Sequence, residues 1–105
     1  MARKQSLSLI ETIWREHDAA PFPEGVAGLE VAGICVTSLD TFAAGCIQTY
    51  VDSGGRLDQE RVAVLASCCR DFAVVLPQMT GEAIAYFARL EKLANMVLES
   101  VEHAA

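Results

Sequence analysis

Four cysteines are the residues of this sequence best suited to redox or metal chemistry. Cys68 and Cys69 are adjacent, which does not match the C-x-x-C spacing of redox-active and zinc-binding pairs. Cys35 and Cys46 would lie about three turns, or about 16 Å, apart on one helix, too far to share a metal ion. All four lie in apolar stretches, so we predict small buried hydrophobic residues, with Cys69 and not Cys68 on the apolar seam of its helix. A thiol sensor that pairs Cys68 or Cys69 with another helix is the alternative.

The two histidines could bind a metal ion or transfer protons. His17 and His103 each fall near the expected C-terminus of a helix, where a positive charge is stabilised by the helix dipole. They could hold a metal with Glu99 or Glu102 if the first and last helices pack together. However, the sequence lacks the Glu-x-x-His pairs of di-iron bundles. Capping of a helix end or exposure to solvent is therefore the favoured interpretation.

Asp40 is the only charged residue between Val31 and Val51. Burial there would raise its pKa and suit it to carry a proton or bind a ligand. The favoured interpretation is that it lies in water or pairs with an arginine of a neighbouring helix, such as Arg61, Arg70 or Arg89. The nucleophile-elbow, phosphate-loop, zinc-protease and dinucleotide-binding motifs are all absent. We therefore expect no catalytic residue, no metal site and no cofactor.

Composition limits the class of protein and of partner. The 105 residues fit a single helical domain, residues 1–105, and 52% of them are hydrophobic. The net charge of −6 disfavours nucleic acids, which bind mainly through lysine and arginine, and favours a basic protein partner. We find neither a membrane-spanning stretch nor a signal peptide, so we expect a cytoplasmic protein that does not enter membranes.

Helical spacing of apolar residues recurs along the whole chain. It predicts a shorter first helix over about Ser6–Asp18, followed by a break rich in proline and glycine. Gly54 and Gly55 end the second helix, Asp58 caps the third, Pro77 stops it and Thr80 caps the fourth. Because the links are short, neighbouring helices should be antiparallel. The predicted fold is an all-α, up-and-down antiparallel four-helix bundle.

The second helix carries the functional hypothesis. From Leu29 to about Asp52, apolar residues step alternately by three and four positions. A strand over Leu29–Val36 is the competing interpretation, but one short strand would have no sheet to join. A helix that is apolar most of the way round is buried on more than one side.

A second apolar face of this helix should therefore contact another chain. The candidate interface residues are Ile34, Asp40, Phe42, Gly45 and Ile47, with Gly45 allowing another backbone, from within the chain or across a dimer, to approach closely. The alternative is that five polar residues form a sufficient solvent-exposed face: Thr37, Ser38, Thr41, Gln48 and Thr49.

These patterns favour a non-catalytic protein–protein interaction module. Such a module would self-associate, as a homo-oligomer and most simply a dimer, or dock a protein partner, as inhibitors, immunity proteins and adaptors do. The rival hypothesis is a small-molecule or metal-binding bundle, or a small enzyme, that uses aspartate, histidine or cysteine inside the core.

Overall fold

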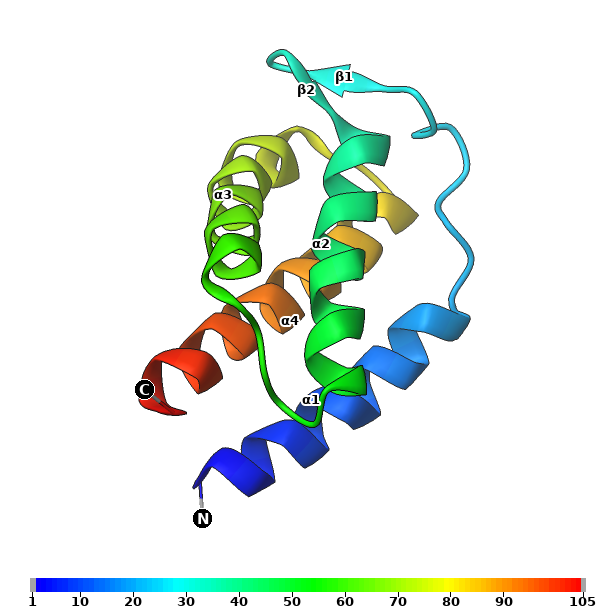
Figure 1. The fold of residues 1–105 in the computed structure, drawn as a ribbon. Coiled ribbons are helices and arrows are strands. Elements are labelled where there is room, and N and C mark those ends of the chain that lie inside the picture. Colours follow the sequence, from blue (N-terminus) through cyan, green and yellow to red (C-terminus); the bar gives the residue numbers. More distant parts are fainter. Residues whose placement is uncertain (1, 105) are drawn as a thin grey trace.

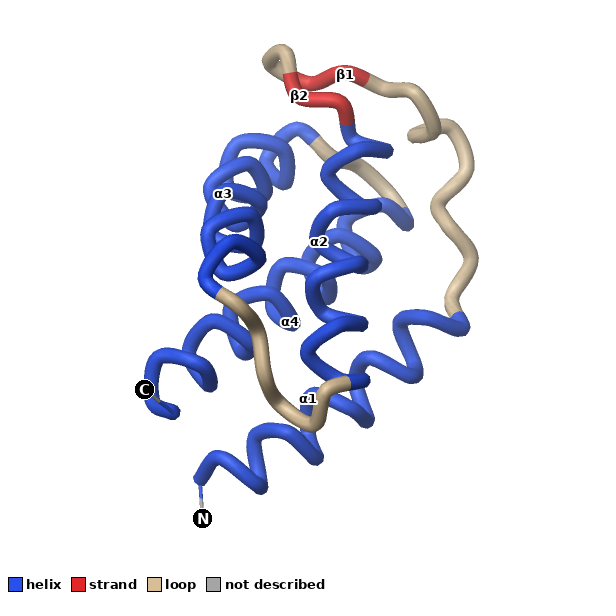
Figure 2. The backbone as a smooth tube through the Cα atoms, in the orientation of Figure 1, coloured by secondary structure: helices blue, strands red, loops and turns tan. Residues whose placement is uncertain are grey.

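The computed structural model describes the backbone of residues 2–104 and the side chains of residues 6–101. Its four helices are α1 (Ala2–Ala19), α2 (Val36–Asp52), α3 (Gln59–Val75) and α4 (Glu82–Ala104). A short 3-10 helix, η1 (Leu76–Gln78), precedes α4, and a hairpin of β1 (Glu30–Val31) and β2 (Ile34–Cys35) precedes α2. The chain is an all-α four-helix bundle, as the sequence predicts (Figures 1 and 2).

The helices form two pairs. In Figure 1, α2 and α3 run antiparallel on the near side of the molecule, and α1 and α4 run obliquely behind them. The helix α4 packs against each of the other three, whereas α1 packs mainly against α4. The pair α2–α3 therefore turns one broad side toward the rest of the bundle and the opposite side toward solvent.

The alternating three-and-four spacing predicted for the second helix is the core face of α2. Val36, Leu39, Ala43, Cys46 and Tyr50 are all buried, as the pattern requires. Their partners are side chains of α3 and α4 that are completely buried: Leu65, Phe72, Val75, Phe87, Leu90, Leu93, Ala94 and Val97. Removing these apolar side chains from water is the main force that holds the helices together.

The prediction that this helix extends back to Leu29 is wrong, because the preceding residues turn back on themselves as a hairpin. Glu30 pairs with Cys35, and Val31 pairs with Ile34. Between them, Ala32 and Gly33 have φ angles of 50° and 81°, the positive pair that a two-residue hairpin turn requires. The strand β1 therefore pairs with β2, the next strand along the chain, and α2 begins only at Val36.

The end of α2 and the start of α3 follow the expected capping chemistry, whereas α4 begins at Glu82 and is preceded by Gly81, not by the predicted cap Thr80. The side chain of Asp58 accepts a hydrogen bond from the backbone N–H of Arg61 and caps α3. Gly54 and Gly55 take positive φ angles directly after α2. One detail of the prediction is wrong: α1 has 18 residues and is no shorter than α2 or α3, which have 17 each.

Candidate functional site

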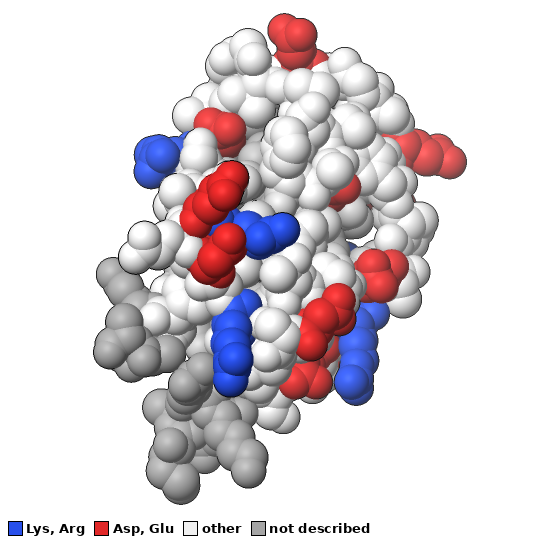
Figure 3. All heavy atoms as spheres, in the orientation of Figure 1, with Lys and Arg blue, Asp and Glu red and all other residues white. Residues whose placement is uncertain are grey.

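Phe42 is the most exposed large hydrophobic side chain that the structure describes. Its side chain is 59% exposed in the middle of α2, and Val64 of α3 beside it is 38% exposed. In Figure 3, uncharged atoms cover most of the surface around α2, and acidic and basic side chains lie beside them. An aromatic ring in such a position places apolar surface in water, which is unfavourable unless something covers it.

Two shallow hollows flank this pair of side chains. Phe42 and Val64 line both hollows and separate them. The first, of about 420 Å³, is also lined by Thr41, Gly45, Cys46, Thr49, Glu60 and Arg61. The second, of about 390 Å³, lies toward the hairpin and is also lined by Gly33, Ile34, Cys35, Ser38, Leu39, Ser67, Cys68 and Asp71. We call Phe42, Val64 and the two hollows the α2–α3 face.

No contact within the chain explains why position 45 is a glycine. It lies in the interior of α2, is exposed, and a Cβ added there would meet no atom within 4 Å. The interpretation that Gly45 permits close packing between helices of one chain is therefore wrong. A glycine in a helix interior costs about 0.5–1 kcal/mol relative to alanine. Here its effect is to deepen the first hollow beside Phe42.

The structure separates the five predicted interface residues into two groups. Ile34, Phe42 and Gly45 belong to the α2–α3 face, whereas Ile47 is fully buried and Asp40 lies outside the linings of both hollows. Ile47 cannot meet a partner, because it is four residues after Ala43 and three before Tyr50 and shares their core face.

The residues that the sequence interpretation missed come from α3. Val64, Arg61 and Asp71 complete the hollows, but no pattern within the second helix could identify its neighbour on the surface.

Asp40 joins a group of polar side chains inside the bundle. Its Oδ1 accepts a hydrogen bond of 2.7 Å from the hydroxyl of Tyr86 on α4. Burial raises the pKa of Asp40, and the hydrogen bond from Tyr86 partly offsets this. Burial, followed by that same hydrogen bond, raises the pKa of Tyr86. The partner of Asp40 is therefore a tyrosine and not an arginine, and the pair ties α2 to α4.

His17 is buried, so the expectation that it caps a helix end or lies in solvent is wrong. Its ring is 3% exposed and packs against the ring of Tyr86, with 4.3 Å between the ring centres. The Nε of Arg89 donates a 2.8 Å hydrogen bond to His17 Nδ1. Burial, and then the charge of Arg89, lowers the pKa of His17 to about 4. His17 is thus neutral at pH 7 and carries its proton on Nε2, which has no partner among the described residues.

We call Asp40, Tyr86, His17 and Arg89 the interior polar cluster. It connects α1, α2 and α4, and none of its members lines either hollow of the α2–α3 face. The possible metal site formed by His17 and His103 is not tested, because the side chain of His103 lies outside the described residues. Among the side chains at positions 6–101, no three histidine, cysteine, aspartate or glutamate groups are placed to hold a metal ion.

The cysteines are free thiols. Cys46 and Cys68 are buried, and Cys35 and Cys69 are half-buried. The core position of α3 is therefore occupied by Cys68, not by Cys69 as its sequence pattern suggested. Burial raises the pKa of Cys68 to about 11, so its reactive thiolate form is disfavoured at neutral pH. The Sγ of Cys46 donates a long hydrogen bond, 3.7 Å, to the carbonyl oxygen of Arg61.

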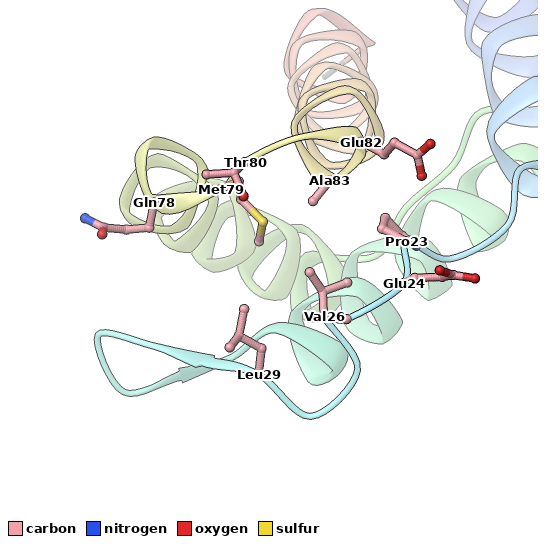
Figure 4. Close-up of a pocket in the computed structure, with 10 residues that line it drawn as sticks. Pro23, Glu24, Val26, Leu29, Gln78, Met79, Thr80, Glu82 and Ala83 are labelled. Carbon is pink, nitrogen blue, oxygen red and sulfur yellow. The ribbon is translucent and has the colours of Figure 1, made fainter.

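A third hollow, of about 280 Å³, lies between the loop before β1 and the start of α4. Val26, Met79 and Ala83 form its buried apolar floor. The carboxylates of Glu24 and Glu82 point outward, away from Met79 (Figure 4). Small-molecule sites need polar groups that converge on the ligand, and these side chains diverge.

Comparisons of the chain with protein-family models, with curated proteins and with solved structures gave no match. No helix within residues 2–104 has the length and apolar character needed to cross a lipid bilayer. The function is therefore argued from the geometry of the chain alone.

Proposed function

We propose that this protein is a non-catalytic protein–protein interaction module and that its docking surface is the α2–α3 face. The exposure of Phe42 between two hollows is the observation that carries the proposal. Phenylalanine, tyrosine and tryptophan are enriched in the buried centres of interfaces, where one aromatic anchor often supplies much of the binding energy.

Two further observations support a binding role over a catalytic one. Gly45 weakens α2 without a compensating contact in the chain, as expected of a position kept small for a partner. Asp40 and His17, on which an enzyme would depend, are engaged with Tyr86 and Arg89 inside the bundle. The net charge of −6 further favours protein over nucleic acid as the partner. We also propose that the protein acts in the cytoplasm.

A photo-crosslinking experiment in the native host tests the docking surface. A benzoyl-phenylalanine at position 42 should form covalent adducts with a protein on irradiation. The matched control is the same residue at position 84, because Ile84 is 46% exposed but lies on α4. Adducts at position 42 and not at position 84 are expected. Equal labelling at both positions, or none at position 42, contradicts the proposal.

A second experiment separates this proposal from a metal-binding or thiol-based function. Protein purified without chelator should carry no stoichiometric metal. Titration of its thiols should show no cysteine that reacts unusually fast. Bound metal or one hyper-reactive cysteine contradicts the non-catalytic proposal.

A further inference from the structure

The outer side of the α2–α3 pair has the residue spacing of a surface on which a helix packs. On each helix, four residues that line the hollows follow one another at spacings of four, three and four: Ser38, Phe42, Gly45 and Thr49 on α2, and Glu60, Val64, Ser67 and Asp71 on α3. Residues so spaced form one stripe along a helix, and two stripes side by side border a groove that fits a third helix. The inner side of the same pair is covered in this way by α4.

The charged groups that line the two hollows are acidic on balance. Glu60 lines the first hollow and Asp71 the second, and neither forms an ion pair with a residue that the structure describes. Arg61 is the one basic residue among the described linings, and its guanidinium is already paired with Asp58, 3.3 Å away. Asp71 is also half-buried, so its carboxylate has lost part of its hydration without gaining a cation. The charge that the face lacks is therefore positive.

The two carboxylates flank the apolar centre of the face. Glu60 and Asp71 lie eleven positions apart on α3, a separation of about 16 Å at a rise of about 1.5 Å per residue, or about three helical turns. Phe42 and Val64 separate the hollows to which these carboxylates belong. The complementary surface has two basic groups about three turns apart with apolar side chains between them. One side of an amphipathic α-helix provides this arrangement.

We propose that the α2–α3 face binds an amphipathic α-helix of a partner protein, with a lysine or arginine beside each of Glu60 and Asp71. This inference rests on the proposed docking surface and names the chemistry of its occupant. The apolar side of the partner helix covers Phe42 and Val64 and places side chains in the hollows on either side of them. Gly45 leaves room for such a side chain in the first hollow. The two charge pairs at the ends fix the register of the helix along the face.

Designed peptides test the chemistry of the partner. The probe is a helical peptide of about 18 residues with leucines at its centre and two arginines about three turns apart, and the matched peptide carries glutamates in place of the arginines. The arginine peptide should bind the full chain with a Kd between about 10 µM and about 1 mM, and the glutamate peptide at least about tenfold more weakly. Backbone NMR shifts should change most at the residues that line the two hollows. Binding that maps elsewhere, or no binding of the arginine peptide at about 1 mM, overturns the proposal.

Reversal of the two carboxylates tests their role directly. Glu60→Lys combined with Asp71→Lys should exchange the preference, so that the glutamate peptide binds better than the arginine peptide. Glu60→Gln combined with Asp71→Asn removes the charges without repulsion and should leave little preference for either peptide. The matched control is Glu16→Lys combined with Glu99→Lys, which changes the net charge equally at exposed positions of α1 and α4 and should keep the original preference. A preference for the arginine peptide that persists in both face variants overturns the proposal.

The anchor variant separates the partner chemistry from the docking surface. Phe42→Ala should weaken binding of the arginine peptide at least about tenfold, whereas the control Ile84→Ala should leave it unchanged. If position 42 crosslinks to a protein in the native host but reversal of the carboxylates has no effect, the docking surface stands and the basic helix is wrong. Capture of a second copy of this chain at position 42 leads to the same conclusion. If neither peptide binding nor an adduct is found, both proposals fail.

Discussion

On the α2–α3 face the aromatic ring of Phe42 is largely exposed to water, whereas His17 is buried and Tyr86 and Asp40 are half-buried between α1, α2 and α4. Two polar links hold the enclosed groups in place, from Tyr86 to Asp40 and from Arg89 to His17. Phe42 has no comparable partner on its outer side. The comparison shows that the interior polar cluster finds its partners within the chain, apart from His17 Nε2, whereas the ring of Phe42 is left largely in water.

The largest expected effect concerns the pH dependence of the interior polar cluster. The pKa of His17 is about 4 in the folded chain and about 6.5 when unfolded, so the unfolded chain takes up its proton first as the pH falls. The free energy of unfolding should therefore fall by roughly 3 kcal/mol between pH 6.5 and pH 4. Burial and Arg89 favour the neutral ring of His17, whereas Asp18 favours its protonated form. The raised pKa of Asp40 offsets part of the loss of stability, because Asp40 takes up its proton in the folded chain before it does so in the unfolded chain.

Urea unfolding at several pH values measures this loss of stability. The variant His17→Gln keeps an acceptor for Arg89 but does not titrate, so its stability should depend much less on pH over this interval. An equal pH dependence in both proteins would show that His17 is not buried and neutral in the folded chain.

The next effect is the loss of the link between α2 and α4. Tyr86→Phe removes a hydrogen bond to the half-buried carboxylate of Asp40 and should lower the free energy of unfolding by about 1.5–3 kcal/mol. Asp40→Asn is the control, because it keeps an acceptor oxygen and removes the buried charge, so its effect should be smaller. A Tyr86→Phe variant as stable as the parent protein contradicts the link.

A smaller effect, of opposite sign, is expected on the α2–α3 face. Gly45→Ala should raise the free energy of unfolding of the monomer by about 0.5–1 kcal/mol, because alanine favours the helix and meets no neighbour. Gly54→Ala is the matched control: this site is equally open, but its φ of +72° strains an alanine. The two substitutions should therefore shift the thermal midpoint in opposite directions, and shifts of the same sign would contradict this account.

The smallest effect on monomer stability is expected at Phe42 itself. Phe42→Ala should change the free energy of unfolding by no more than about 0.5 kcal/mol, as is usual for exposed positions. The measurement should be made in dilute protein, because any self-association would itself stabilise the folded chain. A loss of several kcal/mol would show that the ring supports the fold of one chain.

Local patterns predicted the fold because they act over a few residues. The capping Asp58 and the pair Gly54–Gly55 are short-range signals, and the structure confirms them. The hairpin before α2 escaped prediction because Ala32, a residue without a preference for positive φ, takes its first turn position. The burial of Ile47, by contrast, could have been predicted from its spacing to Ala43 and Tyr50.

The site was less predictable than the fold because it depends on neighbours distant in the sequence. Nothing near His17 indicates that Arg89, 72 positions away, will hydrogen bond to its ring. Likewise, Phe42 could be recognised as apolar, but its exposure follows from where α3 packs against α2. The face of a helix that stays uncovered is decided by tertiary packing, which one helix cannot encode by itself.

The packing of α1 mainly against α4 has a consequence for how the chain acquires its structure. Because α1 precedes α4 in the chain, Ile10 and Trp14, both buried in the finished bundle, lack the cover of α4 until that helix has been made. Contacts between segments far apart in the sequence are slow to form, and apolar surface exposed meanwhile promotes aggregation. During translation the apolar side of α1 is therefore exposed for longer than that of the later helices.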